Sequence, residues 1–368
     1  MLSVNPKARS LKRTDQNLTM TASVQETTIL KSFRREPTER TPVWLMRQAG
    51  RYQKEYREIR EKVDFLTLCK TPELASEVTV MAVRQLDVDA AIIFADILLP
   101  MESFGLGLRF EKGDGPVIER PIASAADVER LPSPDAASDL DYVCEAIKIT
   151  CKELDGNNSV PLIGFAGAPF TVASYAIEGG SSRSFEKTRT FMHAQPEAWN
   201  LLMNKLVAFT ADYLLAQIAA GAAAVQIFDS WVGCLSPLDF EVYVEPHLRL
   251  LISTINGAVP VIYFSTTSAG LLPCISRLGA DVIGVDWRVS LGDAWQTIGF
   301  DHAIQGNLDP MVLLSDRSTI RRHAEDIIRQ ADGRPGHVFN LGHGILPGTP
   351  VDNARYLVEA VRELSHRR

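Results

Sequence analysis

"QPEAWNLLMNKLVAFTADYLLAQIAAGAAAVQIFD", residues 195–229, carries the pattern on which the fold prediction rests. Its first part, residues 195–221, is a long helix-like stretch that ends at Gly221, as helices commonly do. Its last part, residues 223–229, is a short and nearly continuous hydrophobic run. Such runs are typical of strands in a parallel sheet whose two faces are both covered. The stretch therefore predicts a helix that leads into a buried parallel strand.

The same alternation recurs along the chain. Short hydrophobic runs occupy residues 42–46, 89–95, 161–166, 223–229, 259–264, 281–287, 302–308 and 337–342. Helix-like stretches lie between them, such as residues 71–86, which begin with Thr-Pro and place hydrophobic residues at helical spacing. Eight such units in 368 residues predict an α/β protein, a single-domain (β/α)8 barrel of the TIM type over residues 25–368. An open, doubly wound sheet is the alternative.

Two segments depart from an even barrel. Residues 96–160 are too many for one helix, and residues 104–122 place Gly and Asp-Gly turn signals between alternating, strand-like pieces. We predict an inserted β-hairpin there, after the second strand. Residues 167–185 are rich in Gly and Ser and predict a long loop that could form a lid or a wall of a site.

Composition limits the partners. A formal net charge of −7 argues against nucleic acid, so any anion site needs a local positive charge. The five cysteines are scattered without a C-x-x-C pair, which indicates reduced thiols in a cytoplasmic protein. Since hydrophobic stretches are short, we expect no membrane span. Residues 1–24 are polar and predict a disordered N-terminal arm, with a transit peptide as the alternative.

Polar side chains follow most of the predicted strands. In barrel enzymes the working residues lie at the carboxyl ends of the strands, so these side chains are expected to converge on one cavity. They are Arg47, Arg51, Asp96, Tyr175, Asp229, Ser230, Asp286, Asn307 and His343.

Each of these residues also has an ordinary structural interpretation. Clustered arginines often lie on a solvated helix face, and this fits Arg57 better than Arg47 and Arg51, which flank "QAG" before a helix has begun. Asp96 could cap a helix, although its hydrophobic neighbours would make an unpaired carboxylate costly. His343 could be satisfied by backbone, but its two flanking glycines indicate close backbone approach or unusual dihedral angles.

Several chemistries lack their sequence signals. The chain has no phosphate-binding loop, dinucleotide fingerprint, metal-ligand spacing or serine nucleophile elbow, and Asp229 and Asp286 could simply be hydrogen-bonding core residues. The remaining cations, single carboxylate, Tyr, Ser and His suit a small polyanionic ligand that also presents N–H donors. Arginine suits such a ligand because it binds carboxylates at two points and stays charged.

Six motifs together resemble one family. They are "PVWLMRQAGRY", "AAIIFADIL", "GFAGAPFTVASYAIEGG", "FDSWVG", "GNLDP" and "FNLGHGILPGTPVDN", and the resemblance that they carry runs from roughly residue 28 to 364. The chain thus resembles the uroporphyrinogen decarboxylases. The resemblance implies a (β/α)8 barrel, usually a cytosolic homodimer, of haem and chlorophyll biosynthesis. It implies removal of the four acetate carboxyls of uroporphyrinogen III to give coproporphyrinogen III, without cofactor or metal.

The resemblance also implies roles for individual residues. Arg47 and Arg51 match arginines that bind substrate carboxylates, and Asp96 matches the carboxylate that meets the pyrrole N–H groups. The expected catalytic residues are Asp96, Arg47, Tyr175 and His343. The expected substrate-binding residues are Arg47, Gln48, Ala49, Gly50, Arg51, Arg60, Asp96, Tyr175, Ser230 and His343.

Two other functions are weighed against this one. A zinc-dependent corrinoid or thiol methyltransferase of the same superfamily would need a His/Cys metal site, and the sequence offers none with suitable spacing. A non-catalytic tetrapyrrole-binding protein could use the same arginines. Turnover of uroporphyrinogen separates these possibilities.

Overall fold

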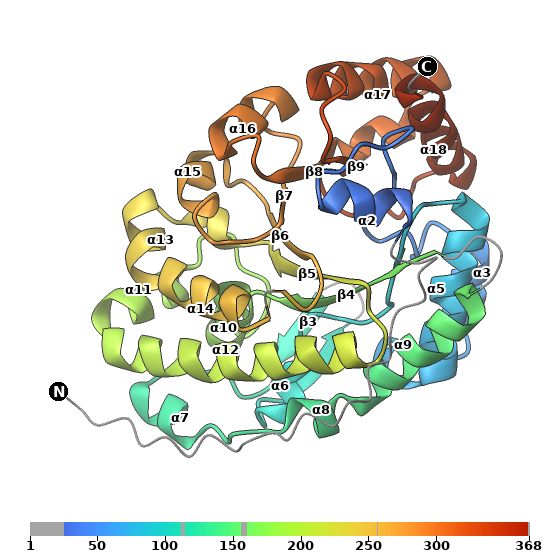
Figure 1. The fold of residues 1–368 in the computed structure, drawn as a ribbon. Coiled ribbons are helices and arrows are strands. Elements are labelled where there is room, and N and C mark those ends of the chain that lie inside the picture. Colours follow the sequence, from blue (N-terminus) through green and yellow to red (C-terminus); the bar gives the residue numbers. More distant parts are fainter. Residues whose placement is uncertain (1–25, 112–114, 156–159, 256, 367–368) are drawn as a thin grey trace.

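A curled sheet of seven parallel strands forms the centre of the molecule, with helices around its outside (Figure 1). The computed structural model describes residues 26–111, 115–155, 160–255 and 257–366, so the predicted arm at residues 1–24 lies outside the described residues. Each strand pairs with the next in the order β1-β4-β5-β6-β7-β8-β9. Their bounds are β1 (Ala91–Ile92), β4 (Leu162–Gly167), β5 (Ala224–Asp229), β6 (Val261–Ser265), β7 (Val282–Gly284), β8 (Ala303–Leu308) and β9 (His337–Leu341).

The predicted strand at residues 42–46 is instead a single bridge between the two edges of this sheet. Val43 bridges Phe339 of β9 in parallel fashion. On its other side, Val43 O accepts from the backbone N–H of Asp89 at 2.8 Å, and the Asp89 side chain accepts from Val43 N at 2.8 Å. Pro42 has no backbone N–H that could donate a hydrogen bond to a neighbouring strand, which helps to explain why the pairing with β9 is short. The segment nevertheless hydrogen-bonds to both edges of the sheet.

A chain of buried polar side chains fixes the same segment from inside the sheet. Trp44 Nε1 donates to Gln305 Oε1 at 3.0 Å, and Gln305 Nε2 donates to Gln226 Oε1 at 3.0 Å. These three side chains are at most 1% exposed. Because buried polar groups are costly when unpaired, this chain specifies how residues 42–46 face β5 and β8. The segment that precedes Arg47 is therefore held on both edges and from within.

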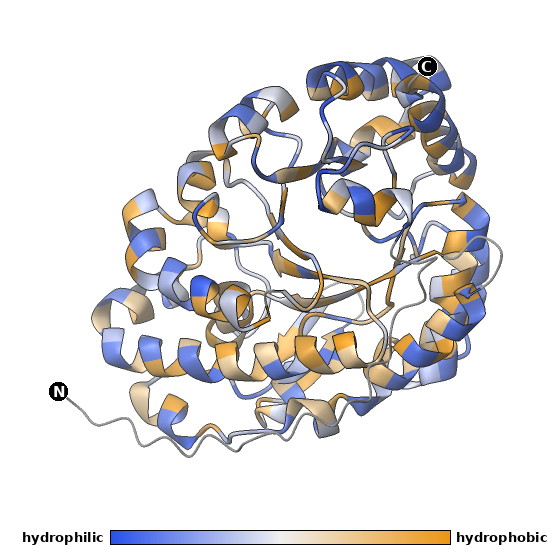
Figure 2. Ribbon diagram, in the orientation of Figure 1, coloured by the Kyte–Doolittle hydropathy of each residue, from blue (hydrophilic) through white to orange (hydrophobic). Residues whose placement is uncertain are grey.

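Helices cover the outside of the sheet, and α2 lies beside β9 (Figure 1). The outer surfaces of α17 and α18 are largely hydrophilic (Figure 2). The longer helices are α5 (Pro72–Leu86), α9 (Asp141–Leu154), α10 (Pro169–Glu178), α12 (Pro196–Ala219), α14 (Glu245–Ile255), α17 (Arg317–Ala331) and α18 (Val351–Ser365). The shorter ones are α2 (Thr28–Phe33), α3 (Lys54–Arg60), α4 (Phe65–Lys70), α6 (Pro100–Ser103), α7 (Ala125–Arg130), α8 (Ala136–Asp139), α11 (Glu186–Ala194), α13 (Pro237–Tyr243), α15 (Leu272–Ile275) and α16 (Leu291–Ile298).

The loop predicted over residues 167–185 is largely wrong, because α10 occupies its first half. Pro169 stands at the start of this helix, where its missing N–H costs nothing, and Gly179 ends it with φ 85°. The Gly/Ser signal belongs only to the residues after Gly179. Tyr175 is consequently held on a helix and not on a loop.

An antiparallel pair of short strands lies between β1 and β4 in the sequence. β2 (Leu108–Glu111) pairs with β3 (Gly115–Ile118). The turn predicted between them falls on residues 112–114, outside the described residues. Ile118 N donates to Gly179 O at 2.9 Å, so β3 is attached to the carboxyl end of α10. Among the described helices, none is long and hydrophobic enough to cross a membrane.

Candidate active site

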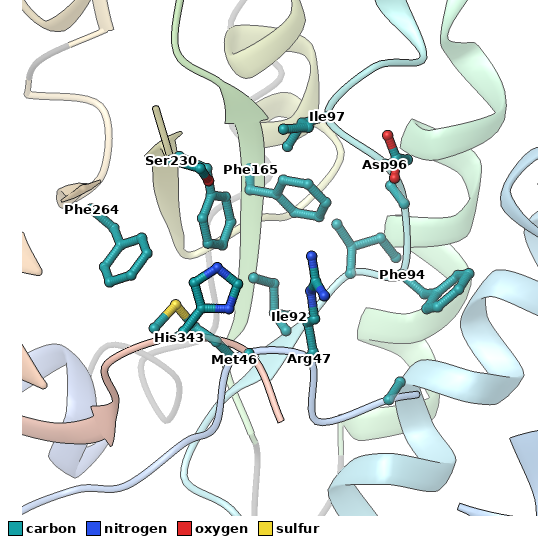
Figure 3. Close-up of a pocket in the computed structure, with 15 residues that line it drawn as sticks. Met46, Arg47, Ile92, Phe94, Asp96, Ile97, Phe165, Ser230, Phe264 and His343 are labelled. Atoms are coloured by element: carbon teal, nitrogen blue, oxygen red, sulfur yellow. The ribbon is translucent and has the colours of Figure 1, made fainter. Parts of the chain in front are cut away.

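A pocket of about 170 Å³ opens where the carboxyl ends of the strands meet (Figure 3). Its walls come from the end of β1 and the residues that follow it, from the ends of β4, β5 and β6, from Met46 and the loop that follows it, and from the loop that follows β9. The residues that line it are Met46, Arg47, Ala49, Ile92, Ile93, Phe94, Ala95, Asp96, Ile97, Phe165, Phe228, Ser230, Phe264, His343 and Gly344. The expected residues Arg47, Ala49, Asp96, Ser230 and His343 are thus brought together from segments far apart in the sequence.

Arg47 enters the pocket from a tight turn. Its backbone is left-handed, with φ 59°, which is uncommon for a residue with a side chain. The turn is fixed on both sides, because Met46 N donates to Asn340 Oδ1 and Ile345 N donates to Met46 O, both at 2.9 Å. Arg47 lies between Asp96 and His343 in Figure 3. Its positive charge acts on both groups, since it lowers the pKa of each.

Most other residues of the "RQAGRY" loop build the loop and do not line the pocket. Gln48 is buried, and its amide donates to Ala90 O at 3.1 Å. Tyr52 donates to Gln48 O at 2.7 Å, and Gly50 N donates to Gln53 Oε1 at 2.9 Å. Arg51 is exposed and is not among the residues that line the pocket. Because α3 begins only at Lys54, the prediction that Arg47 and Arg51 precede the helix is confirmed.

Two further arginines of this region serve the local backbone. Arg57 is exposed, as expected of a solvated helix face, but it donates to Arg51 O at 2.9 Å instead of pairing with the neighbouring acids. Arg60 donates to Val63 O, and its guanidinium lies 5.7 Å from the centre of the Phe65 ring. Arg60 is not among the residues that line the pocket.

Asp96 is the carboxylate of the pocket. Burial raises its pKa to about 6, and the N–H of Leu98 and the charge of Arg47 only partly oppose this rise. Its Oδ1 accepts from Leu98 N at 2.9 Å. The next helix, α6, starts at Pro100 with Leu99 as its N-cap, so the alternative that Asp96 caps a helix is wrong. The site therefore holds a carboxylate in hydrophobic surroundings beside one arginine.

Tyr175 stands next to the pocket on α10. Its ring stacks on that of Trp231, with centroids 3.7 Å apart and an interplanar angle of 28°. Burial, and to a lesser extent the negative charge of Asp96, raise its pKa to about 12. Tyr175 is therefore a neutral phenol near neutral pH. Sequence reasoning found Tyr175 but missed Trp231, the residue that orients it.

His343 follows β9 and is half-buried in the pocket wall. Burial, and then the charges of Arg47 and Arg288, lower its pKa to about 4, so the imidazole is neutral near pH 7. A Cβ on Gly342 would lie 3.0 Å from the carbonyl carbon of Asp286, and one on Gly344 would lie 2.6 Å from Arg47 Cγ. The prediction that the flanking glycines reflect close approach is confirmed.

The other polar strand-end residues form hydrogen bonds within the fold. Asp229 accepts from Thr171 Oγ1 at 2.6 Å and from Tyr263 Oη at 2.8 Å. Asn307 Nδ2 donates to Asp286 O at 2.9 Å. The structural alternative is therefore confirmed for Asp229 and Asp286, which are both buried.

Sequence reasoning missed the hydrophobic wall of the pocket. Phe165, Phe228 and Phe264 come from three neighbouring strands and meet edge to face, with ring centroids 5.4 Å and 5.9 Å apart. The available signal was their shared position near the carboxyl end of successive predicted strands. A hydrophobic wall opposite an arginine and a carboxylate suits a flat or bowl-shaped ligand with an acidic rim.

One group of possible metal ligands occurs among the described residues, and it lies outside this pocket. It consists of Glu241, Glu245 and Cys274. Arg277 lies across it, donating to Glu241 Oε1 at 2.7 Å and to Glu245 Oε2 at 3.0 Å. The carboxylates are thus already neutralised by an ion pair, and the cluster contains no histidine.

Comparisons with known proteins agree on one family. The family model described as uroporphyrinogen decarboxylase matches residues 24–364. A uroporphyrinogen decarboxylase of Carboxydothermus hydrogenoformans is 56% identical over 339 residues, which cover 92% of this chain and 96% of that protein. One of Chloroflexus aurantiacus is also 56% identical, with 90% of this chain and 94% of that protein covered.

Solved structures share the fold at low identity. A methyltransferase from Methanosarcina mazei superposes with a TM-score of 0.76 and 20% identity, covering 91% of this chain and 97% of the other. A B12-independent methionine synthase from Shewanella sp. gives a TM-score of 0.55 and 10% identity, with 82% and 90% covered. At these identities the likeness concerns the fold alone.

Proposed function

Because this chain belongs to the uroporphyrinogen decarboxylase family, we propose that it is a carboxy-lyase that converts uroporphyrinogen III to coproporphyrinogen III. The observation that carries the proposal is the meeting of Asp96 and Arg47 in a pocket walled by aromatic rings, in a chain matched by that family over residues 24–364. The reaction removes the carboxyl groups of the four acetate side chains and leaves four methyl groups.

The pocket suits the chemistry of this substrate. A porphyrinogen has methylene bridges between its pyrrole rings, so the macrocycle can dome and turn its N–H groups to one side. Asp96 can accept from them, and such charge-assisted bonds are stronger than neutral ones. The phenyl rings of Phe165 and Phe228 offer a surface for the macrocycle. Arg47 and Arg51 supply the local positive charge that the carboxylate rim requires in a protein of net charge −7.

The decarboxylation needs an electron sink. A proton added to a pyrrole carbon produces a cationic, iminium-like ring. The bond between the acetate methylene and its carboxylate then breaks, its electron pair enters the ring, and CO2 leaves. A proton added to the exocyclic methylene forms the methyl group, and the proton added earlier to the ring carbon leaves as the aromatic pyrrole is restored. Each decarboxylation therefore consumes one proton overall. The ring itself is the electron sink, and we therefore propose a reaction without metal or cofactor.

In this mechanism Asp96 stabilises the ring cation, since a preorganised charge acts most strongly where charge develops. Arg47 orients the carboxylate that leaves. Arginine is a poor acid by its ordinary pKa, and His343, with its pKa lowered to about 4, is neutral at pH 7. We propose that His343 and Tyr175 support the site as neutral hydrogen-bonding groups beside these two residues.

Further features of the protein belong to the same proposal. The bridge through Val43 supports the closure of the curled sheet into a single-domain (β/α)8 barrel. The five cysteines are free thiols, which supports the proposal that the protein is cytoplasmic, since thiols stay reduced in that compartment. The family resemblance supports a homodimer, for which sedimentation at micromolar concentration should give about twice the chain mass. A fully active monomer would refute the dimer.

Anaerobic turnover of uroporphyrinogen III tests the function. Chromatography should resolve products that lose carboxyl groups until coproporphyrinogen III accumulates. Exhaustive chelation should leave this rate unchanged. A loss of activity that zinc restores would favour the methyltransferase alternative, and tight binding without turnover would favour a non-catalytic tetrapyrrole-binding protein.

A further inference from the structure

We propose that Arg288 binds a carboxylate at the rim of the substrate, on the side of the pocket formed by His343. The inference rests on the proposed function and assigns a rim contact to a residue that the motif comparison did not single out. The carboxylate concerned is one that is not reacting, because the half-buried His343 separates Arg288 from the reacting centre at Asp96 and Arg47.

The position of Arg288 follows from a continuous set of contacts that leads out of the pocket. His343 lines the pocket and meets Trp287 edge to face, with ring centroids 6.5 Å apart. The guanidinium of Arg288 lies over the Trp287 ring, 3.9 Å from its centre. The positive charge of Arg288 also helps to lower the pKa of His343. Arg288 therefore lies at the edge of the pocket, with 45% of its side chain exposed.

The guanidinium is held ready for a ligand. Asp286, whose side chain is 2% exposed, accepts from Arg288 Nη1 at 2.6 Å and from Arg288 N at 3.0 Å. Asp286 is itself tied to the neighbouring loop by the N–H of Thr267 at 2.6 Å. Among the described residues, no acceptor bonds to Nε or Nη2 of Arg288. An arginine carries five N–H donors in a planar fork, so one edge can hold Asp286 while the other receives a substrate carboxylate.

The substitution Arg288→Gln tests this role. A rim contact made equally in the ground state and the transition state should raise KM and leave kcat nearly unchanged. We expect KM for uroporphyrinogen to rise roughly ten- to hundredfold, as for a lost hydrogen bond to a charged group. The fall of kcat/KM with added salt should also become shallower, because one attractive charge is gone. Arg317→Gln is the matched control, since Arg317 lies over the Tyr356 ring, 5.1 Å from its centre, on α17.

Arg288→Lys separates binding from a purely structural role. Lysine keeps the charge beside Asp286 but loses the planar fork, so the fold should persist while KM still rises several-fold. An unchanged KM in either folded variant would overturn the proposal. So would an equal loss of kcat and kcat/KM, which would indicate a structural effect on the loops.

Binding of uroporphyrin, measured by fluorescence, keeps this test independent of the reaction. If the wild-type protein bound uroporphyrin but did not decarboxylate uroporphyrinogen, the proposed function would fail. The dissociation constants of the variants would still test whether Arg288 binds a carboxylate of the ligand. A weaker affinity in Arg288→Gln than in Arg317→Gln supports the rim contact. Equal affinities refute it.

Discussion

Gly344 lies directly against the side chain of Arg47, so that a Cβ on Gly344 would stand 2.6 Å from Arg47 Cγ. The residue beside His343 therefore determines where the guanidinium that lines the pocket can lie. A clash with a flexible side chain is relieved by moving that side chain, so the contact matters more for the site than for folding.

We predict that Gly344→Ala keeps the protein folded but displaces Arg47. Misplacing a positioning group by about 1 Å can cost about a hundredfold in rate, so kcat/KM should fall steeply while the melting temperature changes little. Gly348→Ala is the control in the same loop, because its Cβ would meet Leu314 Cδ2 at an ordinary 3.9 Å. Equal activity in the two variants would contradict the positioning of Arg47 by Gly344.

Arg47→Lys and Arg51→Lys should each lower kcat/KM by about tenfold or more, although charge is kept, because lysine cannot hold a carboxylate at two points. The loss should be larger for Arg47, which lines the pocket, than for the exposed Arg51. Arg84→Lys, at an exposed arginine paired with Glu153 on the outer helices, provides the control for steady-state assays. Normal turnover in both site variants would show that these two arginines lie on a solvated surface and do not bind substrate carboxylates.

Asp96→Asn should lower kcat by about 10²–10³-fold, because the amide keeps the size and an acceptor oxygen but removes the charge that stabilises the ring cation. Burial raises the pKa of Asp96, so its ionised form destabilises the folded protein above pH 6. The asparagine variant should consequently melt at a higher temperature than the wild type at pH 8. Asp96→Glu should retain part of the rate.

The same carboxylate predicts a pH dependence. With a pKa raised to about 6, Asp96 becomes neutral as the pH falls below that value, and kcat/KM of the free enzyme should fall with it. The acid limb should vanish from the residual activity of Asp96→Asn. A fully active Asp96→Asn protein would refute the mechanism.

His337 should make stability depend on pH between about 4 and 6.5. Burial lowers its pKa to about 4, its Nε2 contacts Gly306 O at 3.1 Å, and its Nδ1 has no partner among the described residues. Between these pH values the imidazole of His337 is protonated in the unfolded chain but neutral in the folded protein. The free energy of unfolding therefore falls as the pH drops through this window, and His337 contributes about 3 kcal/mol to that fall. His337→Gln should flatten the curve of unfolding free energy against pH.

That measurement is interpretable because the other groups are common to both proteins. His343 contributes a loss of the same sign, whereas the raised pKa values of Asp96 and Asp229 act in the opposite direction. Subtracting the two urea-denaturation curves at each pH isolates His337. A difference that did not change between pH 6.5 and pH 4.5 would show that this histidine does not resist protonation.

Asp89→Asn should destabilise the segment that bridges β9 and β1. The Asp89 side chain accepts from Arg40 Nη1 at 2.7 Å and from Val43 N at 2.8 Å, and it is only 10% exposed. Its loss should cost about 2–4 kcal/mol, since it leaves the part-buried Arg40 without its partner. Asp87→Asn is the control: the side chain of Asp87 is 81% exposed beside Arg362, and we expect less than about 1 kcal/mol there. Equal denaturation midpoints for both variants would refute this role of Asp89.

The sequence by itself determined the alternation of hydrophobic runs and helices, and it located Arg47, Asp96, Ser230 and His343 after predicted strands. Those features depend on local patterns, because each element must bury its own hydrophobic face. The sequence also predicted the close approach at the glycines around His343, since only glycine lacks the Cβ that would clash there. The helix over residues 169–178 was missed, because a Gly/Ser signal at its end was extended backwards.

Only the tertiary structure decided which side chains share the pocket. Arg47 and Arg51 have the same local context, but only Arg47 turns inward, where Asn340 and Gly344 hold its loop. The aromatic wall and the contact of Arg288 with Trp287 likewise join residues whose direction depends on neighbouring strands. The physical reason is that periodicity specifies which face of an element is buried, whereas the partner on that face comes from segments up to about three hundred residues away.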